Sequence, residues 1–233
     1  MKNKPIIIEF TWLQWSWKTT VLNEIKKQYN FNNDVLIFDE EVKKKYLNET
    51  KIKRLIYNFF NLILNPLLYI NILLLCLKSK SEYKSFFWNF ILLSTNYTLY
   101  KYINKNYNNK AIIFDEFLLH QLLSVSYNIK NRDKYIKNTI KHINLYPIFF
   151  DTSIEISLER TKNRNKAIKF DNLTDWEKRK LLEKNWYLSK YIVEKYCELT
   201  NKPYLEVDGD ASIEEKTRQV MKHIEYIMEI TNN

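Results

Sequence analysis

Residues 12 to 20 read Trp-Leu-Gln-Trp-Ser-Trp-Lys-Thr-Thr, and this stretch decides the fold. It follows the pattern G-x-x-x-x-G-K-[ST] from Trp12 to Thr19, except that tryptophan stands wherever the motif needs glycine. On one side, residues 5 to 10 form a short apolar run typical of a buried parallel strand. On the other side, residues 19 to 29 carry apolar side chains at helical spacing. Strand, loop and helix therefore follow one another in the order that the pattern requires.

A phosphate-binding loop of this kind converges successive backbone N–H groups on an anion, along a path that only glycine adopts cheaply. Indoles at positions 12, 15 and 17 would fill that pocket. The chain has one glycine and six tryptophans, whereas average usage would give roughly 16 glycines. We hypothesise that some or all of these tryptophans are translation artefacts. Some bacterial lineages reassign the UGA stop codon to glycine, and translating such a gene with a code that reads UGA as tryptophan would produce this pattern. The alternatives are a degenerate loop that no longer binds nucleotide, and a chance resemblance with three genuine tryptophans.

The length of the chain favours one α/β domain. A length of 233 residues suits a single domain over 1–233 with a helical insertion. The net charge of +10 favours anionic partners such as nucleotides or an acidic membrane surface, but the lysines are too evenly spread to choose among them. Cys76 and Cys197 lack the spacing of a zinc site or a disulfide scaffold. Because the N-terminal residues do not resemble a signal peptide, we expect a cytoplasmic protein.

The segment from Leu55 to Leu77 has no charged residue over a length that could span a bilayer. Asparagines recur on one helical face before Pro66, which is expected to divide the segment, so two buried or amphipathic helices are favoured over one span. Peripheral membrane contact stays open because basic residues flank the segment. These are Lys51, Lys53, Arg54, Lys78 and Lys80.

Short apolar runs predict five strands, at 5–10, 34–38, 111–114, 148–150 and 204–207. Helical patterns occupy 19–29, 51–107 with breaks near Pro66 and 79–81, the stretch from Ser153 onward, 174–200, and a final helix capped by Ser212 with Glu215. Two further helices separate the third and fourth strands. Strands that alternate with helices predict a parallel sheet covered on both faces.

Four stretches of the chain resemble the P-loop nucleoside and nucleotide kinase superfamily, most closely its thymidylate-kinase-like branch. They are residues 6–20, the Ile-Ile-Phe-Asp-Glu run at 112–116, residues 149–160 together with Arg164, and residues 205–215. The resemblance implies a three-layer α/β P-loop kinase fold with a five-stranded parallel sheet in the order 2-3-1-4-5. It also implies a helical acceptor-side region at about 51–107 and a lid at about 160–172.

The resemblance implies a site for ATP and Mg²⁺. Lys18 would bridge the β- and γ-phosphates, while Thr19 and Asp115 would bind Mg²⁺. Asp210 and Ala211 would lie beside the adenine base. The expected nucleotide-binding residues of the loop and first helical turn are Trp12, Leu13, Gln14, Trp15, Ser16, Trp17, Lys18, Thr19 and Thr20.

The catalytic residues implied alongside Lys18 are two arginines and an acid. Arg160 and Arg164 lie four residues apart, on one helix face, and would reach the transferring phosphoryl group from the lid. Glu40 is the expected base toward the acceptor hydroxyl, with Asp39 and Glu41 as alternatives. Glu116 departs from the family, which often has arginine there, and this weakens a specific thymidylate assignment.

We therefore expect an ATP- and Mg²⁺-dependent phosphotransferase acting on a nucleoside, nucleotide or similar small acceptor. Two alternatives remain: a kinase of a sugar or lipid-linked acceptor at a membrane surface, and a non-catalytic P-loop relative that acts as a binding protein. No signature of nucleic-acid polymer binding accompanies the abundant aromatic residues. A homodimer is also compatible with the sequence.

Overall fold

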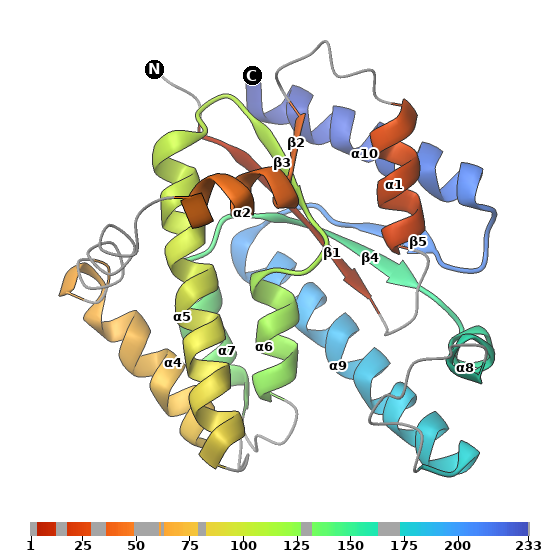
Figure 1. Ribbon diagram of the computed structural model, residues 1–233, viewed down its shortest axis with the longest axis horizontal. Coiled ribbons are helices and arrows are strands. Elements are labelled where there is room, and N and C mark those ends of the chain that lie inside the picture. The colour runs from red at the N-terminus through yellow and green to blue at the C-terminus, as the bar shows by residue number, and fades with distance from the viewer. Residues whose placement is uncertain are drawn as a thin grey trace.

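A computed structural model of the chain describes residues 4–12, 18–28, 36–48, 61, 63–78, 83–126, 132–162 and 173–232. Its strands form one sheet in the order β2-β3-β1-β4-β5, and all four pairings between neighbours are parallel. This is the order that the resemblance implies (Figure 1). The strands are β1 (Ile6–Trp12), β2 (Leu36–Phe38), β3 (Ala111–Phe114), β4 (Tyr146–Asp151) and β5 (Leu205–Asp208).

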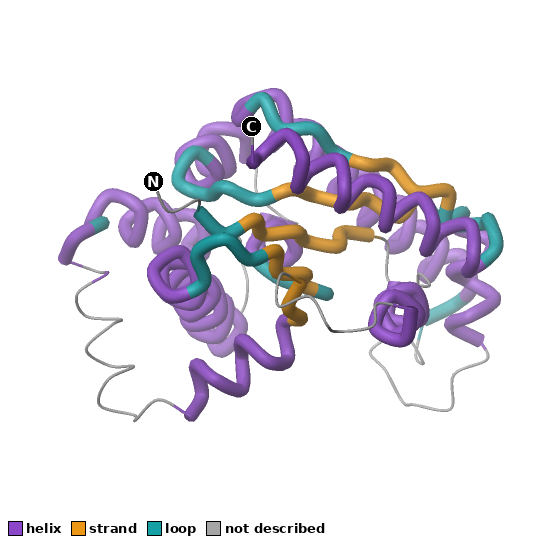
Figure 2. The backbone as a smooth tube through the Cα atoms, turned by 90° about the horizontal axis from the view of Figure 1, so that it is seen from above, coloured by secondary structure: helices purple, strands orange, loops and turns teal. Residues whose placement is uncertain are grey.

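Helices cover both faces of the sheet, so the molecule has three layers (Figures 1 and 2). On one face lie α1 (Lys18–Gln28) and α10 (Ile213–Asn232), which pack against each other. The helices associated with the other face are α2 (Asp39–Asn48), α4 (Pro66–Lys78), α5 (Tyr83–Asn106), α6 (Leu118–Ser126), α7 (Arg132–Ile140) and α9 (Asp175–Thr200). The short helix α8 (Ile154–Lys162) follows β4 and packs on α9.

Alternation along β1 divides the apolar core into two halves. Ile6, Ile8 and Phe10 face α1 and α10, while Ile7 joins the core beneath α4 to α7 and α9. Successive side chains of a strand point to opposite faces of the sheet, so a continuous apolar run is what a strand buried on both faces needs. This pattern explains why the central strands could be located from the sequence.

Strand β4 is longer than expected, because it begins at Tyr146 rather than at residue 148. Pro147 lies inside it. The register pairs Pro147 with Glu9 of β1, whereas pairing with β5 begins only at Ile148. Proline is tolerated where a strand is open on one side, since it has no N–H for the ladder.

The uncharged segment before Leu77 contains a helix boundary, as expected, at Pro66. The second expected break, at residues 79–81, lies outside the described residues, and α5 begins at Tyr83. None of the helices in the described ranges is long and apolar enough to cross a membrane. Residues 51–60 also lie outside the described part of the chain.

Candidate active site

Lys18 is the first residue of α1, directly after the loop, and its side chain is buried. The Lys18 ammonium nitrogen lies 2.8 Å from Oδ1 of Asp115 and 3.1 Å from Oε1 of Glu116. It also donates to the backbone carbonyl of Asp115 at 3.0 Å. The register explains this meeting, because β1 and β3 are parallel neighbours and their carboxyl ends share one edge of the sheet. The structure thus brings together the lysine and the aspartate that the sequence had singled out.

Burial lowers the pKa of Lys18, and the charges of Glu116 and Asp115 oppose that change. Burial likewise raises the pKa of Asp115, against the attraction of the Lys18 charge. Burial also lowers the pKa of His120, against the attraction of the Glu116 charge. Lys18 is thus a buried cation that contacts two carboxylates at this end of the sheet.

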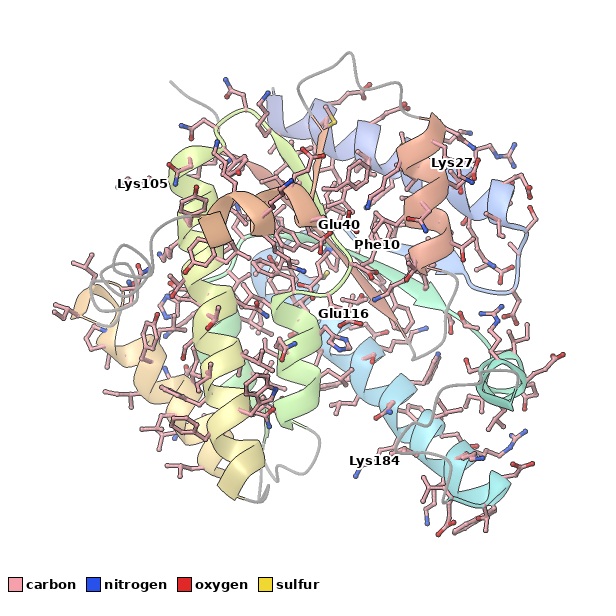
Figure 3. All side chains as sticks on the ribbon, viewed as in Figure 1. Phe10, Lys27, Glu40, Lys105, Glu116 and Lys184 are labelled. Atoms are coloured by element: carbon pink, nitrogen blue, oxygen red, sulfur yellow. The ribbon has the colours of Figure 1, made fainter. Side chains whose placement is uncertain are left out.

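The three acids after β2 form the first turn of α2 and differ in position. Asp39 is buried, accepts a hydrogen bond from Lys43 Nζ at 2.7 Å, and lies close enough to Asp115 to interact with its charge. Glu40 is exposed and its carboxylate is 3.2 Å from Lys26 Nζ. Both Glu40 and Glu116 project from elements at this end of the sheet (Figure 3). Of the three candidate bases, Asp39 is thus the buried one, and its charge raises the pKa of Asp115.

Glu9 is a buried acid on β1 whose role the sequence reading missed. Its Oε1 accepts the backbone N–H groups of Phe117 and His120, at 3.0 and 2.9 Å, and its Oε2 accepts that of Leu119 at 3.0 Å. Glu9 therefore caps the amino end of α6 and fixes the turn that carries Asp115 and Glu116. Burial raises the pKa of Glu9 to about 7, although these hydrogen bonds lower it. The sequence feature that could have indicated this role is the single acid within the apolar run that forms β1.

The residues expected to hold Mg²⁺ offer the oxygen ligands that this ion prefers. Thr19 and Thr20 are exposed in the first turn of α1, directly after Lys18, whose ammonium group contacts the Asp115 carboxylate. Among the described residues, no three His, Cys, Asp or Glu side chains could together hold a metal ion. Mg²⁺ is usually bound through one or two carboxylates, with substrate phosphates and water completing the shell. The donor set of Thr19 and Asp115 therefore fits Mg²⁺ that arrives with a nucleotide.

The expected loop residues Leu13, Gln14, Trp15, Ser16 and Trp17 lie outside the described residues. The backbone of Trp12 forms the end of β1. Arg164 and most of the expected lid also lie outside the described part of the chain.

On the side of β5, the turn before α10 packs tightly against the end of β4. The Gly209 N–H donates to the carbonyl of Asp151 at 2.8 Å. A Cβ on Gly209 would overlap Thr152 Oγ1 and stand 2.6 Å from Thr152 Cα. The one glycine of the chain thus occupies a position where a side chain does not fit.

Arg160 lies half-buried near this same turn. Burial lowers the pKa of its guanidinium, while the nearby charge of Asp210 raises it. Asp210 in turn accepts the backbone N–H of Ser153 at 3.2 Å. The structure therefore brings Arg160 and Asp210 together, with Ala211 in the same turn.

Trp186 on α9 closes a hollow at the end of β4, which Asp151, Ser153, Glu155, Glu183 and Tyr187 also line. Its indole N–H donates to Oδ1 of Asp151 at 2.6 Å, and Lys190 Nζ lies 5.2 Å from the ring centroid. A cation over an aromatic face is attracted to it. The indole of Trp186 thus has a structural use that glycine could not supply.

The chain matches no protein-family model and no curated protein sequence. Solved structures do resemble it. Shikimate kinase from Bacteroides thetaiotaomicron aligns with 94% of this chain and 98% of its own, at 9% identity and a TM-score of 0.45. Deoxyadenosine kinase from M. mycoides, solved with bound dATP, aligns over 94% and 99%, at 16% identity and a TM-score of 0.49. An uncharacterized protein from Eubacterium ventriosum aligns over 95% and 98%, at 12% identity and a TM-score of 0.42.

All three TM-scores lie below 0.5, so the assignment of the fold depends on the chain's own geometry. The parallel sheet has the order implied by the resemblance, and Lys18 opens the helix that follows the first strand. The chain has an α/β, P-loop kinase-like fold.

Proposed function

We propose that this protein is a Mg²⁺-dependent phosphotransferase that moves the γ-phosphoryl group of ATP to a hydroxyl of a nucleoside, nucleotide or similar small acceptor. The observation that carries the proposal is the buried contact between Lys18 Nζ and Asp115 Oδ1, 2.8 Å long, at the carboxyl edge of the sheet. A lysine at the start of the first helix and an acid at the end of the neighbouring strand are the two charges that a P-loop kinase places around the nucleotide phosphates.

Binding of ATP requires that Lys18 exchange part of its contact with the two carboxylates for the β- and γ-phosphates. Thr19 and Asp115 would hold Mg²⁺, which neutralises charge on the phosphate oxygens when it is bound. The backbone of positions 12–17 would supply the converging N–H groups, provided that glycine stands at 12, 15 and 17. Tryptophan at these positions would put indoles where the triphosphate has to lie.

We assign the acceptor side to the acids around Asp115. Asp39 is buried next to it and is held by Lys43, so it is well placed to accept the proton of an acceptor hydroxyl. This position favours Asp39 over Glu40, the base expected from the sequence. Glu116, which replaces the arginine often found in the thymidylate-kinase-like branch, puts negative charge where a phosphorylated acceptor would need positive charge. An acceptor with a free hydroxyl and no phosphate suits this edge better.

We further propose that Arg160 and Arg164 act from the lid. Arg160 is held near Asp210, on the side of the sheet expected to receive the adenine. Closure of the region at about 160–172 over the phosphates would exclude water, so that hydrolysis of ATP does not compete with transfer.

The tryptophans favour a second candidate function, a non-catalytic binding protein. If Trp12, Trp15 and Trp17 are genuine, the nucleotide site is blocked while the sheet and Lys18 remain. The basic surface of the chain would then contact an anionic partner.

Phosphotransfer by two versions of the chain tests the proposal. The glycine-restored chain carries Trp12→Gly, Trp15→Gly and Trp17→Gly. With ATP and Mg²⁺ we expect it to form ADP in proportion to an added acceptor from a panel of nucleosides, nucleoside monophosphates and sugars. Lys18→Met in that background should lower kcat/KM by roughly 100-fold or more. Acceptor-independent ADP formation, or transfer unaffected by Lys18→Met, would overturn the proposal.

A further inference from the structure

Lys216 is a lysine whose side chain the fold buries completely. It lies in the first turn of α10, where its backbone N–H donates to the carbonyl of Ser212 at 3.0 Å. Its side chain is 0% exposed. The apolar side chains that α10 packs into the core follow Lys216 at helical spacing, and they are Val220, Ile224 and Ile227. Lysine thus stands where an apolar residue would continue the buried face of the helix.

A buried ammonium group is costly unless opposite charges lie near it. Burial lowers the pKa of Lys216, and the nearby charge of Arg160 lowers it further. The charges of Asp208 and Asp210 oppose this change. Asp208 ends β5, and Asp210 belongs to the turn before α10. Lys216 therefore interacts with the turn that we expect beside the adenine base, and also with an arginine that we assign to the lid.

Hydrogen bonds tie this turn to the start of α8, on the same side of the molecule (Figure 1). Asp210 Oδ1 accepts the backbone N–H of Ser153, directly before the helix, at 3.2 Å. Asp208 Oδ1 accepts the backbone N–H of Asp210 at 2.9 Å, which fixes the shape of the turn. Arg160 follows Ser153 at helical spacing, and the charge of Asp210 raises its pKa. Asp210 is therefore a carboxylate that attracts both Arg160 and Lys216.

The two cations differ in their freedom to leave Asp210. Arg160 is half-buried on α8, and in the function proposed above it moves toward the phosphates of ATP. Lys216 is held in place because its side chain is enclosed by the protein. Without Lys216, the departure of Arg160 would leave the charges of Asp208 and Asp210 beside a nucleotide that is itself anionic, and like charges repel one another.

We propose that Lys216 is a positioning residue for the phosphoryl donor: it holds Asp210, and with it the turn at 208–211, when Arg160 leaves for the phosphates. This role rests on the proposed function, since it requires ATP to bind beside the turn. Lys216 acts through Asp210 and does not touch the reacting atoms. Its loss should therefore weaken the binding of ATP and leave the chemical step intact.

Calorimetric titration of ATP with Mg²⁺ into the glycine-restored chain and its variants tests this role. Lys216→Met removes the charge and keeps an unbranched side chain that suits the buried face, so folding should survive, which circular dichroism checks. Kd for ATP should rise on the order of 10-fold. In steady-state kinetics, KM for ATP should rise equally, while kcat and the KM of the acceptor stay within about twofold of the parent values. Lys216→Gln also removes the charge and should have the same effect.

Two further variants show whether the effect runs through Asp210. Lys222→Met removes an exposed lysine from the same helix, so it is the matched control for net charge and should leave Kd unchanged. Asp210→Asn removes the charge and keeps an oxygen that can accept the N–H of Ser153. In that background, Lys216→Met should weaken ATP binding by no more than about twofold, because the charge that Lys216 held is gone.

Three results would overturn this role alone. The first is a glycine-restored chain that binds ATP and keeps its Kd on both Lys216→Met and Lys216→Gln. The second is a loss of affinity on Lys216→Met that is equally large with and without Asp210→Asn, because Lys216 would then not act through Asp210. The third is a fall in kcat as large as the rise in KM for ATP, which would indicate a general disturbance of the fold. A glycine-restored chain that binds no ATP would overturn the proposed function and the role of Lys216 together.

Discussion

The ammonium of Lys18 and the carboxylate of Asp115 lie 2.8 Å apart across the β1–β3 pair, although 97 residues separate them in sequence. The contact joins the first turn of α1 to the turn after β3. Neither charge is well hydrated, since the Lys18 side chain is 6% exposed and that of Asp115 28%. Charges brought together with little water around them interact strongly and are costly to separate. A ligand that replaces one of them must itself be charged.

The acid that serves the acceptor can be identified by paired substitutions in the glycine-restored chain. Asp39→Asn should lower kcat by roughly 10²- to 10⁴-fold, because a positioned base is lost while the shape is kept. Glu40→Gln should leave kcat within the same order of magnitude, since Glu40 is exposed and paired with Lys26. Steady-state kinetics with the acceptor that is phosphorylated most efficiently give kcat for both variants and show which acid is the base. The opposite pattern would return the role to Glu40.

Glu9 should make stability depend on pH near neutrality. Folding raises its pKa from 4.5 to about 7, so between these values the native state holds a proton that the unfolded state has released. The contribution of Glu9 is therefore greatest below pH 4.5 and falls as pH rises toward 7, by about 3 kcal/mol in all. Glu9→Gln removes this slope. It should also cost about 1–3 kcal/mol at pH 5, because an amide NH₂ then faces a backbone N–H.

Urea unfolding of both chains at pH 5, 6, 7 and 8 measures the effect as a difference. The difference is needed because burial lowers the pKa of His120, His142 and His223, and these groups add stability as pH rises toward 6.5. Their contribution cancels when the two chains are compared. Parallel stability–pH curves would show that Glu9 does not titrate in this range.

Gly209→Ala should destabilise the fold by about 2 kcal/mol, because the new methyl group meets the backbone of Asp151 and Thr152 and something must shift. Thermal or urea unfolding gives the change in the free energy of unfolding. Glu225→Ala, exposed on α10, serves as the control and should stay within about 0.5 kcal/mol. Equal effects of the two substitutions would contradict the close approach of β4 and the turn after β5.

A comparison of Trp186→Gly with Trp88→Gly tests whether the indole of Trp186 contributes to the free energy of unfolding. Both positions are inside helices, so the helix-propensity penalty of glycine is shared and cancels. Trp186 donates to Asp151, whereas Trp88 is 61% exposed. Trp186→Gly should therefore cost about 2 kcal/mol more. Equal changes in the free energy of unfolding would show that the indole of Trp186 has no structural role, and glycine would then suit position 186 as well as tryptophan does.

The sheet and the main charges of the site could be predicted because both depend on local sequence. Runs such as residues 111–114 are apolar on both faces, and an acid directly after such a strand must lie at the carboxyl edge. The choice among Asp39, Glu40 and Glu41 could not be predicted, since it depends on how α2 is rotated against β3. The cap that Glu9 provides for α6 was hidden for a similar reason, because it joins residues more than a hundred positions apart. Likewise, the sequence revealed the uncharged helices but not which side of α4 the core would cover.

Titration of ATP with Mg²⁺ into the chain as written and into the glycine-restored chain tests the central claim most directly, with isothermal calorimetry as the measurement. We predict that the glycine-restored chain binds ATP and that the chain with Trp12, Trp15 and Trp17 binds it weakly or not at all. Binding in the restored chain should depend on Lys18. If neither version binds ATP, the site around Lys18 and Asp115 does not hold a nucleotide, and the kinase function is contradicted.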